Sequence, residues 1–249
     1  IGVTVRRTGG TSVTLFFGRI LGKPEAGVMA TAVARLVPVQ GTCGFTPWMI
    51  RDWPFADPIN LGDLATLNYR VCGPQEECPE REEPGWFSPV QFPPITKPEC
   101  GNPQPGGNVY RDNITSGSSC DCLIGIGDIL SIETGNMVGP TVQGVDALIA
   151  MDPNAVYNTV TNEVDGSQFA DWTQSPRIVN VLIFDPNLVL TPSTPEIEVV
   201  KIAAFFINNI SGTGQELFVT GHFVGITTSG GIPGDPGTPS FIFTAQLIR

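Results

Sequence analysis

Alternating apolar and polar residues predict β-strands at both ends of the chain. Residues 3–6 alternate with a period of two, and residues 28–39 form a long stretch rich in Val and Ala. Four more apolar stretches, separated by Pro, Gly, Ser and Asn, occupy the last third: residues 177–184, 198–208, 217–227 and 241–247. Their spacing predicts four antiparallel neighbours. The stretch 217–227 is mostly apolar on both faces, which predicts a central strand.

Two segments instead carry apolar residues at helical spacing. The first spans residues 12–21 and can end at Gly22, while the second spans residues 141–150. Pro140 suits the first turn of the second helix, and Asp152 and the proline after it end the pattern. The simplest role for both helices is to pack against the strands.

Residues 71–108 differ from the rest of the chain. This window contains nine prolines, three cysteines and a run of five glutamates between residues 76 and 83. Prolines at this density disfavour a helix or a central strand, whereas Trp86, Phe87, Phe92 and Ile95 require burial. We expect an ordered loop that lies over the body and is pinned by disulfides. The acidic run lacks the twelve-residue pattern of a calcium loop and is interpreted as solvated.

Composition places these elements in one fold class. The chain has 249 residues, of which 29 are Gly, 23 are Pro and only 15% are charged. Such turn-rich sequence favours many short strands. We predict an α+β fold, predominantly antiparallel β: a β-rich body with two short helices and a long Pro/Cys-rich, disulfide-pinned loop. We expect a single domain, 1–249, containing the insertion 71–108. The net charge of −11 argues against a nucleic-acid partner.

The cysteines indicate an oxidising compartment. Six cysteines with one histidine in the whole chain leave few zinc ligands, so disulfides are favoured over a metal site or free thiols. The candidates are Cys43, Cys72, Cys78, Cys100, Cys120 and Cys122. Spacing does not determine their pairing, although Cys72 with Cys78 is the favoured pair and Cys120 lies too close to Cys122 to pair with it.

Other features agree with an exported protein at the cell surface. Asn113 and Asn209 begin Asn-x-Ser/Thr triplets, which a glycosylating secretory route could modify and which also arise by chance. The chain starts without Met and without a signal-peptide pattern, so we expect that a preceding segment was removed. We expect contact with a membrane only through such a missing N-terminal anchor.

The sequence contains no constellation typical of an enzyme. His222 lies in an apolar strand pattern without a nucleophile elbow, so a packed sheet histidine is the better interpretation. The glycines of residues 125–128 lack the third glycine of a dinucleotide fingerprint. Two carboxylate pairs, Asp146 with Asp152 and Glu163 with Asp165, are interpreted as turn and cap residues. We therefore assign no catalytic, cofactor-binding or metal-binding residue and expect no cofactor.

Several motifs together resemble one protein family. Near the start they are Val3-Thr-Val-Arg-Arg, Val13-Thr-Leu-Phe-Phe-Gly-Arg-Ile-Leu-Gly and Val28-Met-Ala-Thr-Ala-Val-Ala. Later they are Tyr110-Arg-Asp-Asn-Ile, Gly127-Asp-Ile-Leu, Glu133-Thr-Gly-Asn-Met-Val-Gly-Pro-Thr-Val-Gln-Gly-Val-Asp and Pro176-Arg-Ile-Val-Asn-Val-Leu-Ile-Phe-Asp-Pro. From residue 1 to about residue 224, the chain resembles extracytoplasmic TadE/TadG-like proteins of the Flp/Tad pilus-assembly system. The resemblance implies location, fold and envelope partners, and carries over no catalytic residue.

We therefore expect a non-enzymatic structural protein of a bacterial envelope. It would be a pilus-associated component or the subunit of an extracellular filament, joined to other copies or to envelope proteins through strands 1–6 and 241–249. The competing expectation is that both termini pair within their own chain. A second function class is a binding module for glycans or proteins, with Trp48, Trp53, Trp86 and Phe87 as an aromatic platform, unless those rings are buried. A secreted hydrolase is a third.

Overall fold

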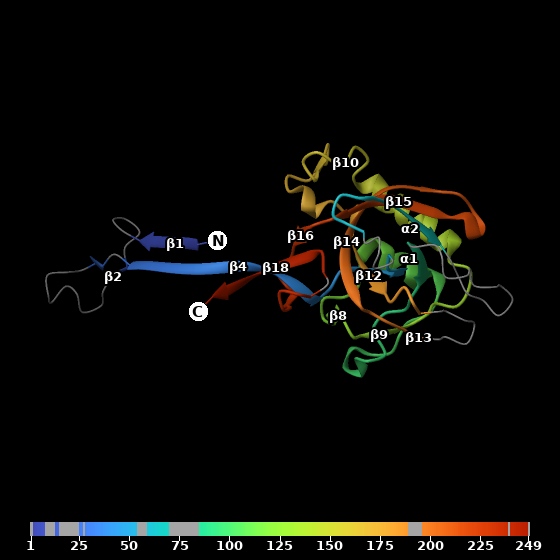
Figure 1. The fold of residues 1–249 in the computed structure, drawn as a ribbon, viewed down its shortest axis with the longest axis horizontal. Coiled ribbons are helices and arrows are strands. Elements are labelled where there is room, and N and C mark those ends of the chain that lie inside the picture. Colours follow the sequence, from blue (N-terminus) through green and yellow to red (C-terminus); the bar gives the residue numbers. More distant parts are fainter. Residues whose placement is uncertain are drawn as a thin grey trace. The chain divides into compact units, whose positions relative to one another are not determined.

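The chain divides into two compact units. The structure, a computed structural model, describes residues 2–7, 13–14, 25–26, 28–53, 59–69, 85–188, 196–238 and 240–248 (Figure 1). Unit 1 comprises Ile1–Val37 and Ala245–Arg249, and unit 2 comprises Pro38–Thr244. Strands β4 (Val28–Thr42) and β18 (Ile242–Ile248) contribute residues to both.

Unit 1 is built on an antiparallel ribbon. β1 (Gly2–Arg7) pairs with β4, from Gly2 opposite Val33 to Arg7 opposite Val28. β2 (Val13–Thr14) pairs with β3 (Glu25–Ala26) farther along the same hairpin. Near the C-terminus, the Gln246 side chain accepts two hydrogen bonds, of 2.9 and 3.1 Å, from the Arg35 side chain of β4.

These pairings test four predictions from the sequence. The strands at 3–6 and 28–39 are confirmed. The helix at 12–21 is wrong at its start, because Val13 and Thr14 pair as a strand, and residues 15–24 lie outside the described part. The predicted strand at 241–247 corresponds to β18, which lies between β4 and β16 (Ile226–Thr227). β16 is the end of the predicted stretch 217–227 and pairs with β18 in parallel, so residues 241–247 are not a fourth antiparallel neighbour.

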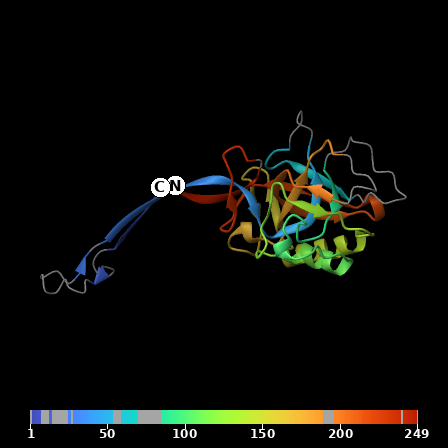
Figure 2. The same ribbon diagram turned by 90° about the horizontal axis from the view of Figure 1, so that it is seen from below.

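The body of unit 2 is a closed six-stranded barrel (Figures 1 and 2). Its strands, in order around the barrel, are β12 (Ile178–Phe184), β14 (Lys201–Ser211), β15 (Phe218–Val224), β6 (Leu64–Tyr69), β7 (Trp86–Pro89) and β5 (Phe45–Arg51). Neighbours are antiparallel except for two parallel pairs, β6 with β7 and β5 with β12. As predicted, β15 is a central strand, between β14 and β6.

Both faces of the barrel strands are apolar because both are covered. Along β14, Phe205 belongs to one buried cluster and Phe206 to the other, as expected when successive side chains point to opposite faces. In the cluster that contains Phe206, Trp86 packs edge-on against Phe184, with ring centroids 5.3 Å apart. The cluster that contains Phe205 also receives side chains from both α-helices.

One barrel strand comes from the window where prolines were expected to exclude central strands. Trp86–Pro89 pairs on both sides, so that expectation is wrong for these residues. Pro89 ends β7, where a missing N–H costs little. Pro47 in β5 coincides with a register shift against β12, so the ladder skips the position without a donor. Residues 70–84, with Cys72, Cys78 and the acidic run, lie outside the described part.

Two α-helices cover one face of the barrel strands. α2 (Val138–Met151) confirms the predicted helix at 141–150, with Pro140 in its first turn and Asp152 at its end. α1 (Gly107–Ser116) was not predicted, because its sequence is largely polar. It buries Tyr110 and Ile114, one turn apart, and Gly117 follows it with φ of 71°.

Short elements complete unit 2. The pairs are β9 (Ile129–Ser131) with β13 (Glu196–Glu198), β10 (Val156–Asn158) with β11 (Glu163–Asp165), and β8 (Ile124–Gly125) and β17 (Ile232–Pro233) with β4. Short 3₁₀ helices are η2 (Pro98–Cys100), η3 (Trp172–Gln174) and η4 (Gly214–Glu216). β17 joins the Gly- and Pro-rich residues 230–238 to β4. The β-rich, mostly antiparallel α+β fold with two helices is confirmed.

The two helices pack closely at Gly144, so a larger side chain there should destabilise unit 2. A Cβ at Gly144 would lie 2.7 Å from Ile114 Cγ2, so Gly144→Ala should destabilise unit 2 by about 1–3 kcal/mol in urea unfolding. Gly139→Ala, on the same helix, meets no atom within 4 Å and should be neutral or stabilising by up to about 1 kcal/mol. Equal effects of the two substitutions would contradict this packing.

Candidate functional site: a pocket beside two disulfides

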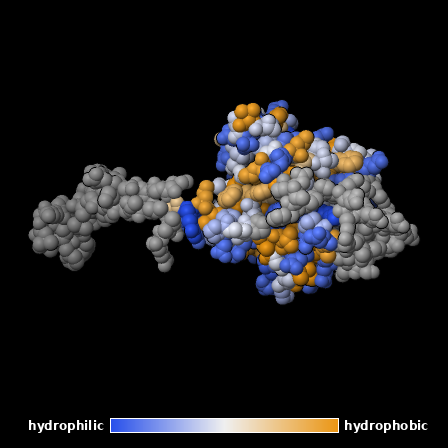
Figure 3. Space-filling view, in the orientation of Figure 1, coloured by the Kyte–Doolittle hydropathy of each residue, from blue (hydrophilic) through white to orange (hydrophobic). Residues whose placement is uncertain are grey.

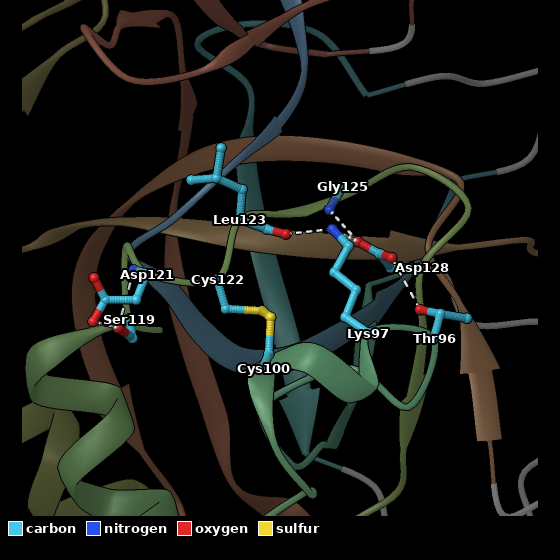
Figure 4. Close-up of a disulfide and its surroundings, with 9 residues drawn as sticks. All are labelled: Thr96, Lys97, Cys100, Ser119, Asp121, Cys122, Leu123, Gly125 and Asp128. Carbon is cyan, nitrogen blue, oxygen red and sulfur yellow. Dashed lines mark hydrogen bonds and ion pairs between the residues drawn. A yellow bond between two sulfur atoms is a disulfide. The ribbon is translucent and has the colours of Figure 1, made fainter.

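Two disulfides hold the segment that follows α1. Cys43 pairs with Cys120 and Cys100 pairs with Cys122, with Cα atoms 4.9 and 5.7 Å apart. Figure 4 shows the Cys100–Cys122 bond. One bond reaches the turn between β4 and β5, and the other reaches η2. The pairs confirm disulfide bonding for four of the six candidates, while Cys72 and Cys78 lie outside the described part. Both bonds are compatible with an oxidising compartment.

An ion pair between Lys97, which precedes Cys100, and Asp128, which follows Cys122, flanks the Cys100–Cys122 bond in the sequence. Lys97 Nζ lies 2.7 Å from Asp128 Oδ2 and also donates to the carbonyl of Leu123. Asp128 accepts further hydrogen bonds from Thr96 Oγ1 at 2.9 Å and from the amide of Gly125 at 2.8 Å (Figure 4). This lysine is therefore engaged by the segment that follows Cys122.

A pocket of about 400 Å³ opens beside the Cys100–Cys122 disulfide. Its apolar wall comes from Phe92, Pro93, Val109, Ile124 and the Cys100–Cys122 disulfide. Its polar lining consists of Glu99, Gln104, Asn113, Ser118, Ser119 and Asp121. The lining contains two carboxylates and no Lys, Arg or His, so it is rich in hydrogen-bond acceptors.

The serines of the pocket are held by the backbone. Ser118 Oγ accepts a hydrogen bond from the amide of Phe45 at 3.1 Å, and Ser119 Oγ accepts one from the amide of Asp121 at 3.2 Å. His222 is engaged elsewhere: its Nδ1 lies 3.0 Å from the carbonyl oxygen of Gly62, and its ring stacks on Tyr157 at 4.4 Å. His222 is thus a packed sheet histidine, as interpreted from the sequence.

The aromatic side chains proposed as an exposed platform are not exposed. Trp48 and Phe87 are completely buried, Trp86 is 4% exposed, and Trp53 is half-buried against Phe223. The sequence predicted a loop at Trp86 and Phe87, whereas barrel closure places Trp48, Trp86 and Phe87 in the core. The indole N–H of Trp48 donates to Tyr110 Oη at 2.9 Å, which ties the barrel to α1.

Tyr110 continues this network into α2. Its hydroxyl lies 3.1 Å from Thr141 Oγ1, which in turn donates to the carbonyl of Met137 at 2.7 Å. Burial raises the pKa of Tyr110 above its usual range, and the hydrogen bond with Thr141 opposes this effect only in part. Tyr110 therefore remains a neutral phenol that joins the helices to the barrel.

Asp152 and Arg177 are both buried, and Arg177 donates a hydrogen bond of 3.1 Å to the backbone carbonyl of Asp152. The Asp152 carboxylate accepts from Ser175 and Ser167 at 2.6 and 2.7 Å and from the amide of Gln168 at 3.0 Å. Burial alone would raise the pKa of Asp152, but these hydrogen bonds and the Arg177 charge outweigh it and lower that pKa. Burial lowers the pKa of Arg177, an effect that Asp152 opposes.

The carboxylates that the sequence pointed to as turn and cap residues lie apart from the pocket. Asp152 ends α2, as interpreted, whereas Asp146 is exposed within α2 and Glu163 and Asp165 are exposed in β11, so the interpretation is wrong for these three. Asn209 is exposed on β14, whereas Asn113 is half-buried on α1 and lines the pocket. In the described part, no group of three or more His, Cys, Asp or Glu side chains could hold a metal. None of its helices is long and apolar enough to cross a membrane.

The hydrogen bonds of Asp152 predict acid-sensitive stability. Because its folded-state pKa is lowered, its stabilising effect is present above the unfolded-state pKa of about 3.9 and is lost as pH falls through the folded-state value. Asp152→Asn should lower the free energy of unfolding at neutral pH by about 1.5–3 kcal/mol. The difference from the unsubstituted chain should shrink in acid. Asp146→Asn should change little at either pH, and an unchanged Asp152→Asn variant would refute the assignment.

The Cys100–Cys122 bond should stabilise the pocket. It closes a loop with a sequence separation of 22, so replacing both cysteines by Ser should cost about 3 kcal/mol in thermal unfolding. Faster amide exchange in residues 98–104 should accompany the loss. Ser119→Ala, an exposed change in the same pocket, serves as the control. Unchanged stability and exchange in the double variant would show that the bond does not hold this wall.

Comparisons of the chain with known protein families, characterised proteins and solved structures find no match. The resemblance to TadE/TadG-like proteins therefore stays a prediction based on sequence motifs. Any function has to be argued from the described residues.

Proposed function

We propose that this chain is an extracytoplasmic structural protein of a bacterial envelope whose copies associate through β-strand edges. It would serve as a pilus-associated component or as a filament subunit. The observation that carries the proposal is the position of β1. β1 ends its sheet, and β4 is its only partner among the described strands.

An edge strand offers unpaired backbone groups to another chain. One side of β1 pairs with β4 over six residues, so the backbone groups on its other side can accept a further strand. β18 has neighbours on both sides and is less suited to this role. The sequence resemblance to pilus-assembly proteins and the two disulfides support an exported location.

Deleting residues 1–7 tests this function. The intact chain should associate in a concentration-dependent manner in sedimentation velocity and form regular particles in negative-stain electron microscopy. The deletion should weaken association about tenfold or more, because the edge strand is lost. The thermal unfolding of unit 2 should remain unchanged, since β1 belongs to unit 1.

Val160→Ser provides the control for this deletion. Val160 is 88% exposed in unit 2, and its substitution should leave both association and stability unaltered. An intact chain that is monomeric at every concentration, or a deletion that assembles normally, would refute the proposed function.

A further inference from the structure

The two units carry opposite net charges. Unit 1 contains six basic residues and one acidic residue, a net charge of +5, while unit 2 contains seven basic and 23 acidic residues, a net charge of −16. These values sum to the −11 of the chain. The basic residues of unit 1 are Arg6, Arg7, Arg19, Lys23, Arg35 and Arg249. Unit 1 of one copy is therefore electrostatically complementary to unit 2 of another.

The basic residues described in unit 2 are already engaged there. Lys97, Arg111 and Lys201 form ion pairs with Asp128, Asp112 and Asp52. Arg51 donates to the carbonyl of Pro186, and the buried Arg177 donates to four carbonyls. No ion pair joins Glu99 or Asp121, the carboxylates of the pocket, to a basic side chain of the described residues.

The pocket combines this negative charge with apolar walls. Gln104 uses its amide NH₂ to donate to the carbonyl of Asn102 at 2.9 Å, which leaves its oxygen as an acceptor. The volume of about 400 Å³ lies within the range of about 300–1,000 Å³ typical of ligand pockets. Ile124 of β8, which is buried, contributes to the apolar wall of the pocket. Figure 3 shows hydrophobic residues interspersed among hydrophilic ones on the face of unit 2 that it draws.

An arginine side chain matches this combination better than a lysine. A guanidinium group has five donors in one plane and binds carboxylates in a bidentate manner, while its aliphatic stem packs on apolar surface. Arg6 and Arg7 stand at the end of β1, the edge strand on which the proposed function depends.

We propose that the disulfide-bordered pocket binds an arginine side chain from β1 of a second copy. This inference rests on the proposed function and names both sides of the contact. The contact is heterologous, because it joins unit 1 of one copy to unit 2 of the next. Repeated without closure, it builds an open fibre. Charged residues on β1 then restrict pairing to partners that carry carboxylates.

The first test removes the two carboxylates from the full chain. Glu99→Gln with Asp121→Asn should weaken self-association about tenfold or more in sedimentation velocity, and added salt should weaken the intact chain in the same direction. The matched control is Glu163→Gln with Asp235→Asn, which makes the same charge change at exposed positions outside the pocket. The control should change association by less than about twofold.

The second test uses a small probe and does not require assembly. Nα-acetyl-argininamide should shift the backbone NMR signals of Asn113, Ser119 and Cys122 in the intact chain. The isosteric citrulline amide should not shift them, and neither probe should do so in the Glu99→Gln, Asp121→Asn variant. Normal thermal unfolding of that variant shows that it is folded.

The outcomes separate this inference from the proposed function. Assembly that survives in the pocket variant, or an arginine probe that leaves the pocket signals unmoved, overturns the inference and leaves the proposed function standing. A chain that is monomeric at every concentration overturns both, even if the probe binds. In a third outcome, the pocket signals of the intact chain are the same at all protein concentrations but change when residues 1–7 are deleted. This outcome assigns the occupant to the same chain and also overturns the inference.

Discussion

Closure of the barrel by the parallel pair β5–β12 is the constraint on which unit 2 depends. It joins residues 45–51 to residues 180–184, more than a hundred positions away in sequence. Closure removes the free edges of the six strands and leaves both faces to be covered, which explains why Phe205 and Phe206 are both fully buried. Contacts between copies that use strand edges therefore have to use strands outside the barrel.

Local patterns predicted what local sequence controls. The strands at 178–184 and 201–211 and helix α2 follow from apolar periodicity and turn residues alone. The place of β18 did not follow, because pairing with β4 is a contact between distant segments. The sequence did not predict β7, because prolines disfavour a central strand and the sequence alone does not show that Pro89 ends the strand. α1 has only the pair Tyr110 and Ile114 to mark its buried side.

The candidate site was predictable only in part. The cysteines and their oxidising setting could be identified from number and context, but their pairing depends on where α1 and η2 lie. The aromatic residues fitted both a binding platform and a buried core, because residue type alone does not distinguish the two. The pocket brings together Phe92 and Glu99, which precede α1, with Asn113 of α1 and Asp121, which follows it, and no sequence motif connects them.

The two disulfides raise the question of how each cysteine finds its correct partner during oxidation. Cys120 and Cys122 are separated by one residue, so exchanging their partners would change each loop, of 77 and 22 positions, by only two. Loop-closure entropy depends on the logarithm of loop length and barely discriminates between the two pairings. The correct choice must come from structure formed before the bonds close. Oxidation of the unfolded chain should therefore yield mixed isomers, and reshuffling should resolve them only as the barrel forms.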